Sequence, residues 1–150
     1  EKIALEPDIL VFGKKTQISG IMVNEKYSEA IKSSYRKLEV TFDGDLIDAC
    51  RAEYILKAIA KYNLLDKVKE NSSIFFDELS PLFLNYRSEG HLIAFDFELE
   101  KERDDFVKKA YESNLLVNPT SQSSVRIRPN LALSKEEIED FLHRVRKILN

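Results

Sequence analysis

The chain has 150 residues, a formal net charge of -3 and a hydrophobic share of 43%. This is the size of one ordinary globular domain, and a content of only 4 Gly and 4 Pro excludes collagen-like and low-complexity chains. The acidic balance excludes a general nucleic-acid binder, the single Cys50 excludes a disulfide framework, and the apolar runs are too short to span a membrane. We expect a cytoplasmic protein of mixed α and β structure.

The first segment predicts two strands joined by a polar loop. Because the chain begins at Glu1 without a Met and soon enters an apolar run, we expect a piece of a longer polypeptide. Residues 7–13 predict a buried strand of the kind found in parallel sheets that are covered on both faces. Residues 20–23 predict a second strand, and residues 14–17 a loop between them.

The middle of the chain predicts two helices and a strand. Apolar residues recur at helical spacing from Asp45 to about Tyr62, and the Asp45 side chain can cap the amino end of this helix. A further helix follows to residue 76, or as far as residue 86 if Pro81 only kinks or restarts it. Residues 91–99 alternate between apolar and polar, which predicts a half-buried strand.

The last third predicts the remaining parts of a small α/β sandwich, with helices packed against a sheet. Residues 101–113 favour a helix, and residues 115–117 and 124–131 favour two short strands. The last helix has the clearest pattern. Ser134 and Glu137 form a capping box at its start, and apolar residues then recur every three or four positions.

Lys14 is the first candidate for chemistry. It stands at the carboxyl end of the first predicted strand, where rigid backbone would hold its amine beside Lys15. A lysine amine can form a Schiff base with a carbonyl compound. The alternative is that this loop is simply solvated; it is not a P-loop, because Asp8 stands where that pattern needs its first glycine.

Arg126 and Arg128 are the second candidate. On a strand their side chains share one face, while Val125 and Ile127 share the other. Two guanidinium groups on one face repel each other unless an anion satisfies both, and a carboxylate suits this purpose. Pro129 predicts an edge strand that a ligand could approach. The alternative is a solvated sheet face.

Thr41 is the third candidate, because a hydroxyl and backbone amides before a helix can hold a phosphate oxygen. A simple capping role is the alternative. No cluster of His, Cys, Asp and Glu has metal-ligand spacing, so no metal site is predicted.

Several segments resemble one family. The string Pro-Asp-Ile-Leu-Val-Phe-Gly-Lys-Lys-Thr-Gln at residues 7–17 resembles the cofactor-lysine segment of class III aminotransferases, and most of all its lysine 6-aminotransferase branch. Thr41, Arg-Ser-Glu-Gly at residues 87–90 and Val-Arg-Ile-Arg-Pro at residues 125–129 resemble later segments of that family, in the same order. The resemblance covers only the carboxyl-terminal part of the family's chain.

The resemblance implies an α/β fold, namely the carboxyl-terminal part of a fold-type I transferase that depends on pyridoxal 5'-phosphate (PLP). Residues 1–40 would end the large cofactor-binding domain, residues 41–62 would form a connecting helix, and residues 63–150 would form the small domain. The partners it implies are the missing amino-terminal region of the same enzyme and a second subunit, which would complete a homodimer.

The resemblance also implies roles for the candidate residues. Lys14 would bind PLP as a Schiff base and then move the proton between substrate and cofactor. Thr41 would donate a hydrogen bond to the cofactor phosphate across the dimer interface. Arg126 would bind the carboxylate of 2-oxoglutarate, supported by Arg128. Because the family's other cofactor-binding residues lie upstream of this segment, we expect the 150-residue chain alone to be inactive.

The implied reaction moves the terminal amine of L-lysine to 2-oxoglutarate and forms glutamate. A 4-aminobutyrate or ornithine type of donor is an alternative, as is another fold-type I PLP enzyme, such as a decarboxylase or a racemase. A non-enzymatic α/β binding module is a further alternative. Glu39 and Asp43 stand where lysine aminotransferases have Asn and Gly, and we expect these departures to bear on donor specificity.

Overall fold

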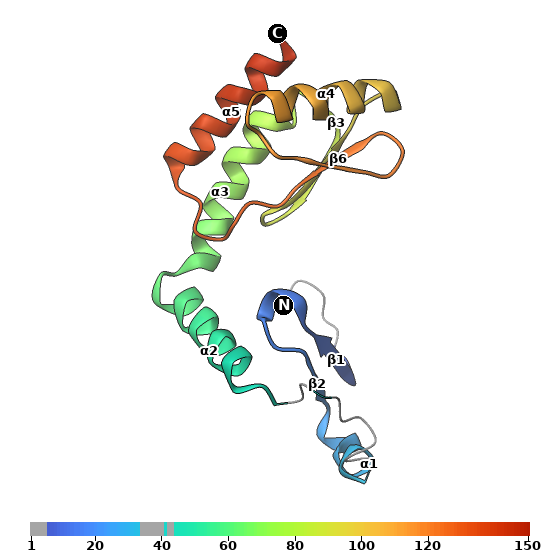
Figure 1. Ribbon diagram of the computed structural model, residues 1–150, viewed down its shortest axis with the longest axis vertical. Helices are drawn as coiled ribbons and strands as arrows, with labels where there is room; N and C mark the ends of the chain where they lie inside the picture. The colour runs from blue at the N-terminus through green and yellow to red at the C-terminus, as the bar shows by residue number, and fades with distance from the viewer. Residues whose placement is uncertain (1–5, 34–40, 42–43) are drawn as a thin grey trace. The chain divides into compact units, whose positions relative to one another are not determined.

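The computed structural model describes residues 6–33, 41 and 44–150 and consists of two compact units (Figure 1). One unit ends at Tyr62 and the other begins at Asn63. Across the described residues, no helix combines the length and the apolar character that a membrane crossing needs.

The first unit opens with a β-hairpin. Strands β1 (Ile9–Phe12) and β2 (Gly20–Val23) occur where the sequence predicts them, but they pair antiparallel. The position of the first strand is therefore confirmed, but its predicted parallel pairing and burial are wrong. Val11 is 75% exposed and Met22 is 58% exposed, because a lone pair of strands leaves its faces open unless another layer packs on it.

After the hairpin, the described residues of the first unit form the short helices η2 (Glu25–Tyr27) and α1 (Ser28–Lys32) and the long helix α2 (Leu46–Lys61). The Asp45 carboxylate accepts hydrogen bonds from the backbone N–H groups of Ile47 at 2.8 Å and Asp48 at 3.0 Å. The predicted amino-terminal cap is thus confirmed, and such a cap contributes about 1 kcal/mol.

The second unit is a four-stranded antiparallel sheet with three helices. The strand order is β3-β4-β6-β5, and the helices lie on one side of the sheet (Figure 1). The predicted α/β sandwich is confirmed. Its elements in chain order are α3 (Leu64–Leu79), β3 (Leu84–Glu89), β4 (Leu92–Asp96), α4 (Glu100–Glu112), β5 (Asn118–Thr120), β6 (Ser124–Ile127) and α5 (Lys135–Leu149).

Several element boundaries differ from the sequence prediction, and the strand expected at residues 91–99 covers only Leu92–Asp96. Helix α3 ends before Pro81 and strand β3 follows, because Pro81 has no backbone N–H to continue the hydrogen-bond pattern of the helix. Strand β5 begins at Asn118, after the predicted segment at 115–117. Strand β6 ends at Ile127 and lies between β4 and β5, so the predicted edge position is wrong. Pro129 lies beyond the strand, where its missing N–H removes no ladder bond.

The strand register separates a core face from an outer face of the sheet. Ile93 pairs with Ile127 and Phe95 with Val125, and all four are buried beneath the helices. Phe83 stacks on Phe95 with the ring centroids 3.8 Å apart. Full burial of such a side chain contributes about 1.5–3 kcal/mol, so this face fixes the orientation of the strands.

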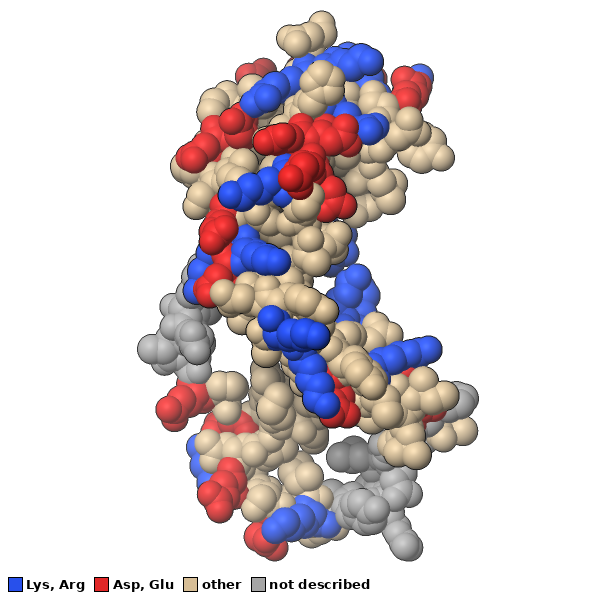
Figure 2. Space-filling view, turned by 90° about the vertical axis from the view of Figure 1, so that its left-hand side faces the viewer, with Lys and Arg blue, Asp and Glu red and all other residues tan. Residues whose placement is uncertain are grey.

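Helix α5 forms as the sequence predicts. The Glu137 N–H donates to Ser134 Oγ at 3.2 Å, and the Ser134 N–H donates to Glu137 Oε2 at 2.8 Å, which confirms the capping box. Its apolar stripe is buried against the sheet and the other helices. Figure 2 shows acidic and basic side chains interspersed over this side of the second unit, as is typical of a solvated helix face.

Candidate active site

Lys14 directly follows the first strand and opens a single helical turn, η1 (Lys14–Thr16). Its backbone is left-handed, with a φ of 61°, a region that few non-glycine residues adopt. Such strain persists only where the surroundings impose it, and it is frequent at functional sites. The Lys14 side chain is exposed, and across the part of the chain that is described its ammonium has no hydrogen bond or ion pair. The hairpin therefore presents an unengaged primary amine.

Thr41 lies in an exposed turn shortly before Asp45, the cap of α2. Residues 34–40 and 42–43 lie outside the described residues, and with them Glu39 and Asp43. The role of Thr41 toward a phosphate group stays a prediction.

Arg126 projects from the outer face of the sheet in the second unit. Val125 and Ile127 are buried while Arg126 is exposed, which confirms the predicted alternation along β6. Arg128 lies just past the end of the strand and is also exposed. The structure thus brings the two arginines to the same end of β6.

A second arginine on the outer face has a partner that the sequence analysis missed. Arg87 Nη1 donates to Asp96 Oδ1 at 2.9 Å, and Ser124 Oγ donates to the same oxygen at 2.6 Å. Asn85 Nδ2 donates to Asp96 Oδ2 at 3.2 Å. The sequence did indicate that Asp96 could have polar partners on the outer face, because the alternating pattern of residues 91–99 places it on the polar face of its strand.

These contacts determine the charge state of the Asp96 carboxyl group. Burial disfavours its ionised form, but the hydrogen bonds from Ser124, Arg87 and Asn85 outweigh burial and hold the pKa of Asp96 below its ordinary value. The ionised carboxylate balances the charge of Arg87. By contrast, the Arg126 guanidinium has no hydrogen bond or ion pair within the described ranges 6–33, 41 and 44–150.

A hollow of about 350 Å³ lies beside this unbalanced guanidinium. The register places Ala94 between Arg87 and Arg126, so a small side chain separates two large ones. This volume lies within the usual range of small-molecule sites. An unpaired guanidinium beside a hollow can hold a carboxylate through two parallel hydrogen bonds. The hollow is lined by residues 87–89, residues 92–94 and Arg126.

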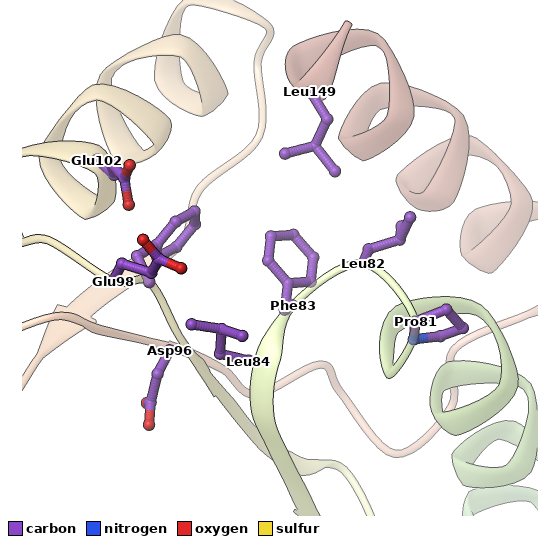
Figure 3. Close-up of a pocket in the computed structure, with 9 residues that line it drawn as sticks. Pro81, Leu82, Phe83, Leu84, Asp96, Glu98, Glu102 and Leu149 are labelled. Atoms are coloured by element: carbon purple, nitrogen blue, oxygen red, sulfur yellow. The ribbon is translucent and has the colours of Figure 1, made fainter.

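Another hollow, of about 330 Å³, lies near the start of β3 and the carboxyl end of α5 (Figure 3). Apolar side chains that include Phe83 and Leu149 line it, with Glu98 and Glu102 at its border, while the Asp96 carboxylate points away from it. None of the four predicted site residues lines this hollow.

Comparison with known proteins identifies the family to which the chain belongs. The sequence profile described as "Aminotransferase class-III" matches residues 1–149. The chain belongs to the class-III aminotransferase family. Members of this family depend on pyridoxal phosphate, so the expected family, fold class and cofactor class are confirmed.

Similar class-III aminotransferases include proteins with different named activities. L-lysine-epsilon aminotransferase of Mycobacterium bovis is 30% identical over 99% of this chain and 35% of its own length. 4-aminobutyrate aminotransferase of Dictyostelium discoideum is 32% identical over 92% of this chain and 29% of its own length. The chain therefore spans about a third of the length of the curated relatives it matches.

A solved structure supports the same family fold. Lysine aminotransferase from Mycobacterium tuberculosis in the internal aldimine form superposes with a TM-score of 0.89. It is 29% identical, and the alignment covers 97% of this chain and 36% of that one. The described residues fit the family's cofactor, because the exposed Lys14 amine, which has no partner among them, can react with an aldehyde.

Replacing Asp96 with Asn tests the balance of charge on the outer face. We expect Asp96→Asn to lower the free energy of unfolding of the full-length protein by about 1–2 kcal/mol. The loss is smaller than for a fully buried ion pair, because Arg87 is half exposed and solvent screens its charge. Because the pKa of Asp96 is lowered in the folded state, its stabilisation is present above the ordinary carboxyl pKa of 3.8 and is lost as the pH falls from there through the lower folded-state pKa. Urea unfolding as a function of pH measures both effects.

The matched control is Glu98→Gln, at an exposed carboxylate on the neighbouring segment. We expect this control to leave stability within about 0.5 kcal/mol of the parent protein. Equal stability of the Asp96→Asn and Glu98→Gln variants at neutral pH would show that the contacts of Asp96 contribute nothing.

Proposed function

We propose that residues 1–150 form the carboxyl-terminal third of a PLP-dependent aminotransferase that moves the terminal amino group of L-lysine to 2-oxoglutarate and forms glutamate. The observation that carries this proposal is the exposed Lys14 amine, which has a left-handed backbone directly behind β1. The family match over residues 1–149 supports it.

Lys14 has two roles in the proposed reaction, covalent attachment of the cofactor and proton transfer. Pyridoxal phosphate, when bound, supplies an aldehyde and the electron sink for amino transfer. Lys14 Nζ would hold this cofactor covalently through its aldehyde carbon. When not bound to the cofactor, Lys14 Nζ would accept the proton from the substrate carbon and later return it, as a general base and acid.

Arg126 binds the carboxylate of the 2-oxo acid, and Arg128 adds positive charge at the same end of β6. Since Asp96 already balances Arg87, the unpaired guanidinium of Arg126 is the stronger anchor for an incoming anion. Thr41 donates its hydroxyl proton in a hydrogen bond to the cofactor phosphate of the neighbouring subunit in a homodimer.

The division of the chain supports a matching assignment of domains. Residues 1–40 complete the large cofactor-binding domain, residues 41–62 form the connecting helix, and residues 63–150 form the small domain. The boundary between the compact units at Tyr62 and Asn63 agrees with the last of these limits. The upstream region of the same polypeptide supplies the other cofactor contacts.

The amino donor is tested with the full-length, PLP-loaded protein. Glutamate formation is measured with 2-oxoglutarate and, in turn, L-lysine, 4-aminobutyrate and ornithine. We expect kcat/KM for L-lysine to exceed that for each competitor by at least about tenfold. The chain of residues 1–150 alone is expected to form no glutamate.

Each other outcome has a definite meaning. A preference for 4-aminobutyrate would replace L-lysine with the second candidate donor, which the 32% identical Dictyostelium relative supports. No glutamate with any of the three donors would contradict the proposed reaction.

A further inference from the structure

His91 occupies the tight turn between β3 and β4. Gly90 and His91 form this two-residue connection, and the φ of 57° at Gly90 fits a hairpin turn with a left-handed first residue. The turn packs closely on α3, because a Cβ at Gly90 would lie 3.0 Å from Val68 Cγ1. His91 itself is only 5% exposed, which is unusual for a polar residue in a hairpin turn.

The contacts of His91 show which tautomer is present. His91 Nδ1 lies 2.9 Å from the backbone carbonyl oxygen of Asn130. A carbonyl oxygen only accepts, so Nδ1 carries the proton and donates it. Nε2 is buried without a partner among the described residues, and Phe75 packs edge-on at a centroid distance of 6.1 Å. Burial outweighs the bond to Asn130 and lowers the pKa of His91, which favours the neutral ring.

The carbonyl that His91 holds belongs to the loop that leaves the arginine strand. Asn130 follows Arg128 and Pro129 closely, and the loop continues to α5. A second buried side chain holds the other end of this loop, because Asn71 Nδ2 donates to the Leu133 carbonyl oxygen at 3.1 Å. The loop is therefore attached to the core at two separate points, and only the point at His91 lies next to the arginines.

We infer that His91 is a positioning residue for the anion site: its Nδ1–H holds the Asn130 carbonyl and thereby fixes the end of β6 that carries Arg126 and Arg128. The reason is geometric, since a guanidinium binds a carboxylate well only when both parallel hydrogen bonds align. Loss of the tether lets this end of the strand move and weakens carboxylate binding. The inference rests on the proposed function, in which Arg126 binds the 2-oxo acid.

The test compares three substitutions of His91 in the full-length, PLP-loaded protein. His91→Leu removes the donor, His91→Gln moves an amide away from the Nδ1 position, and His91→Asn keeps an amide donor near it. We expect His91→Leu and His91→Gln to raise KM for 2-oxoglutarate by about five- to tenfold, with kcat changed less than about twofold. His91→Asn is expected to restore most of the parent KM.

Asn71→Leu is the matched control, because it removes a buried hydrogen bond to the same loop at its distant end. We expect it to lower the thermal midpoint about as much as His91→Leu while leaving KM for 2-oxoglutarate unchanged. Equal KM increases in the two variants, or failure of His91→Asn to restore KM, would overturn the inference. If His91→Leu does not fold, the Gln and Asn variants decide the question.

The result for Arg126 separates the two proposals. An increase in KM on Arg126→Ala, without any effect of the His91 variants, overturns only the inference about His91. An unchanged KM on Arg126→Ala removes the anion site itself and overturns the inference along with that part of the proposed function.

Discussion

The Lys14→Ala variant of the full-length protein is expected to lose at least about 10³-fold in kcat, because it lacks both the covalent anchor for the cofactor and the proton carrier. The amine that it removes is exposed and has no partner in the described part of the chain, so folding does not depend on its contacts. The absorption band of lysine-bound cofactor at the edge of the visible range is expected to disappear. Absorption spectra and steady-state glutamate formation measure the two effects.

Lys15→Ala is the matched control for this experiment. Lys15 lies beside Lys14 in the same helical turn, is also exposed, and has no assigned role. We expect this control to keep the absorption band and most of the turnover. A Lys14→Ala protein that retained both would show that another lysine carries the cofactor.

Arg126→Ala is expected to raise KM for 2-oxoglutarate by about 10²-fold, because loss of a charged bidentate pair costs about 2–3 kcal/mol. The large effect follows from the charges on the outer face of the sheet. Arg87 is engaged by Asp96 and cannot replace the missing guanidinium without leaving this partner. Steady-state kinetics with varied 2-oxoglutarate measures the change.

Two controls make this prediction specific. Arg146→Ala removes a distant arginine on α5 that pairs with Glu78, and we expect KM to remain unchanged. The second control measures turnover of an aldehyde acceptor that lacks a carboxylate, with the parent and the Arg126→Ala enzymes. We expect the substitution to change this turnover much less than the turnover of 2-oxoglutarate. An unchanged KM for 2-oxoglutarate would remove Arg126 from the acceptor site.

Local patterns predicted local structure well. The caps at Asp45 and Ser134 form as expected, because they depend on residues within one helical turn. The alternation along β6 correctly placed Arg126 on the face opposite Val125 and Ile127, since successive side chains of a strand point to opposite faces.

Predictions that depended on neighbours in space were less successful. The run at Ile9–Phe12 predicts a buried parallel strand, yet it pairs antiparallel with β2, and all of its residues except Phe12 are exposed. Pro129 suggested an edge strand, yet β6 is central and simply ends before the proline. Apolar composition and a single proline do not specify which elements pack on a strand.

The amino-acid order by itself determined the helix caps, the two faces of β6 and the family resemblance centred on Lys14. Only the tertiary structure paired Arg87 with Asp96, left Arg126 beside a hollow without a partner among the described residues, and brought His91 to the Asn130 carbonyl. The physical reason is how far apart in the sequence the interacting residues lie. Caps and alternation arise between residues close together in the chain, whereas ion pairs and tethers across a sheet depend on strand order and register.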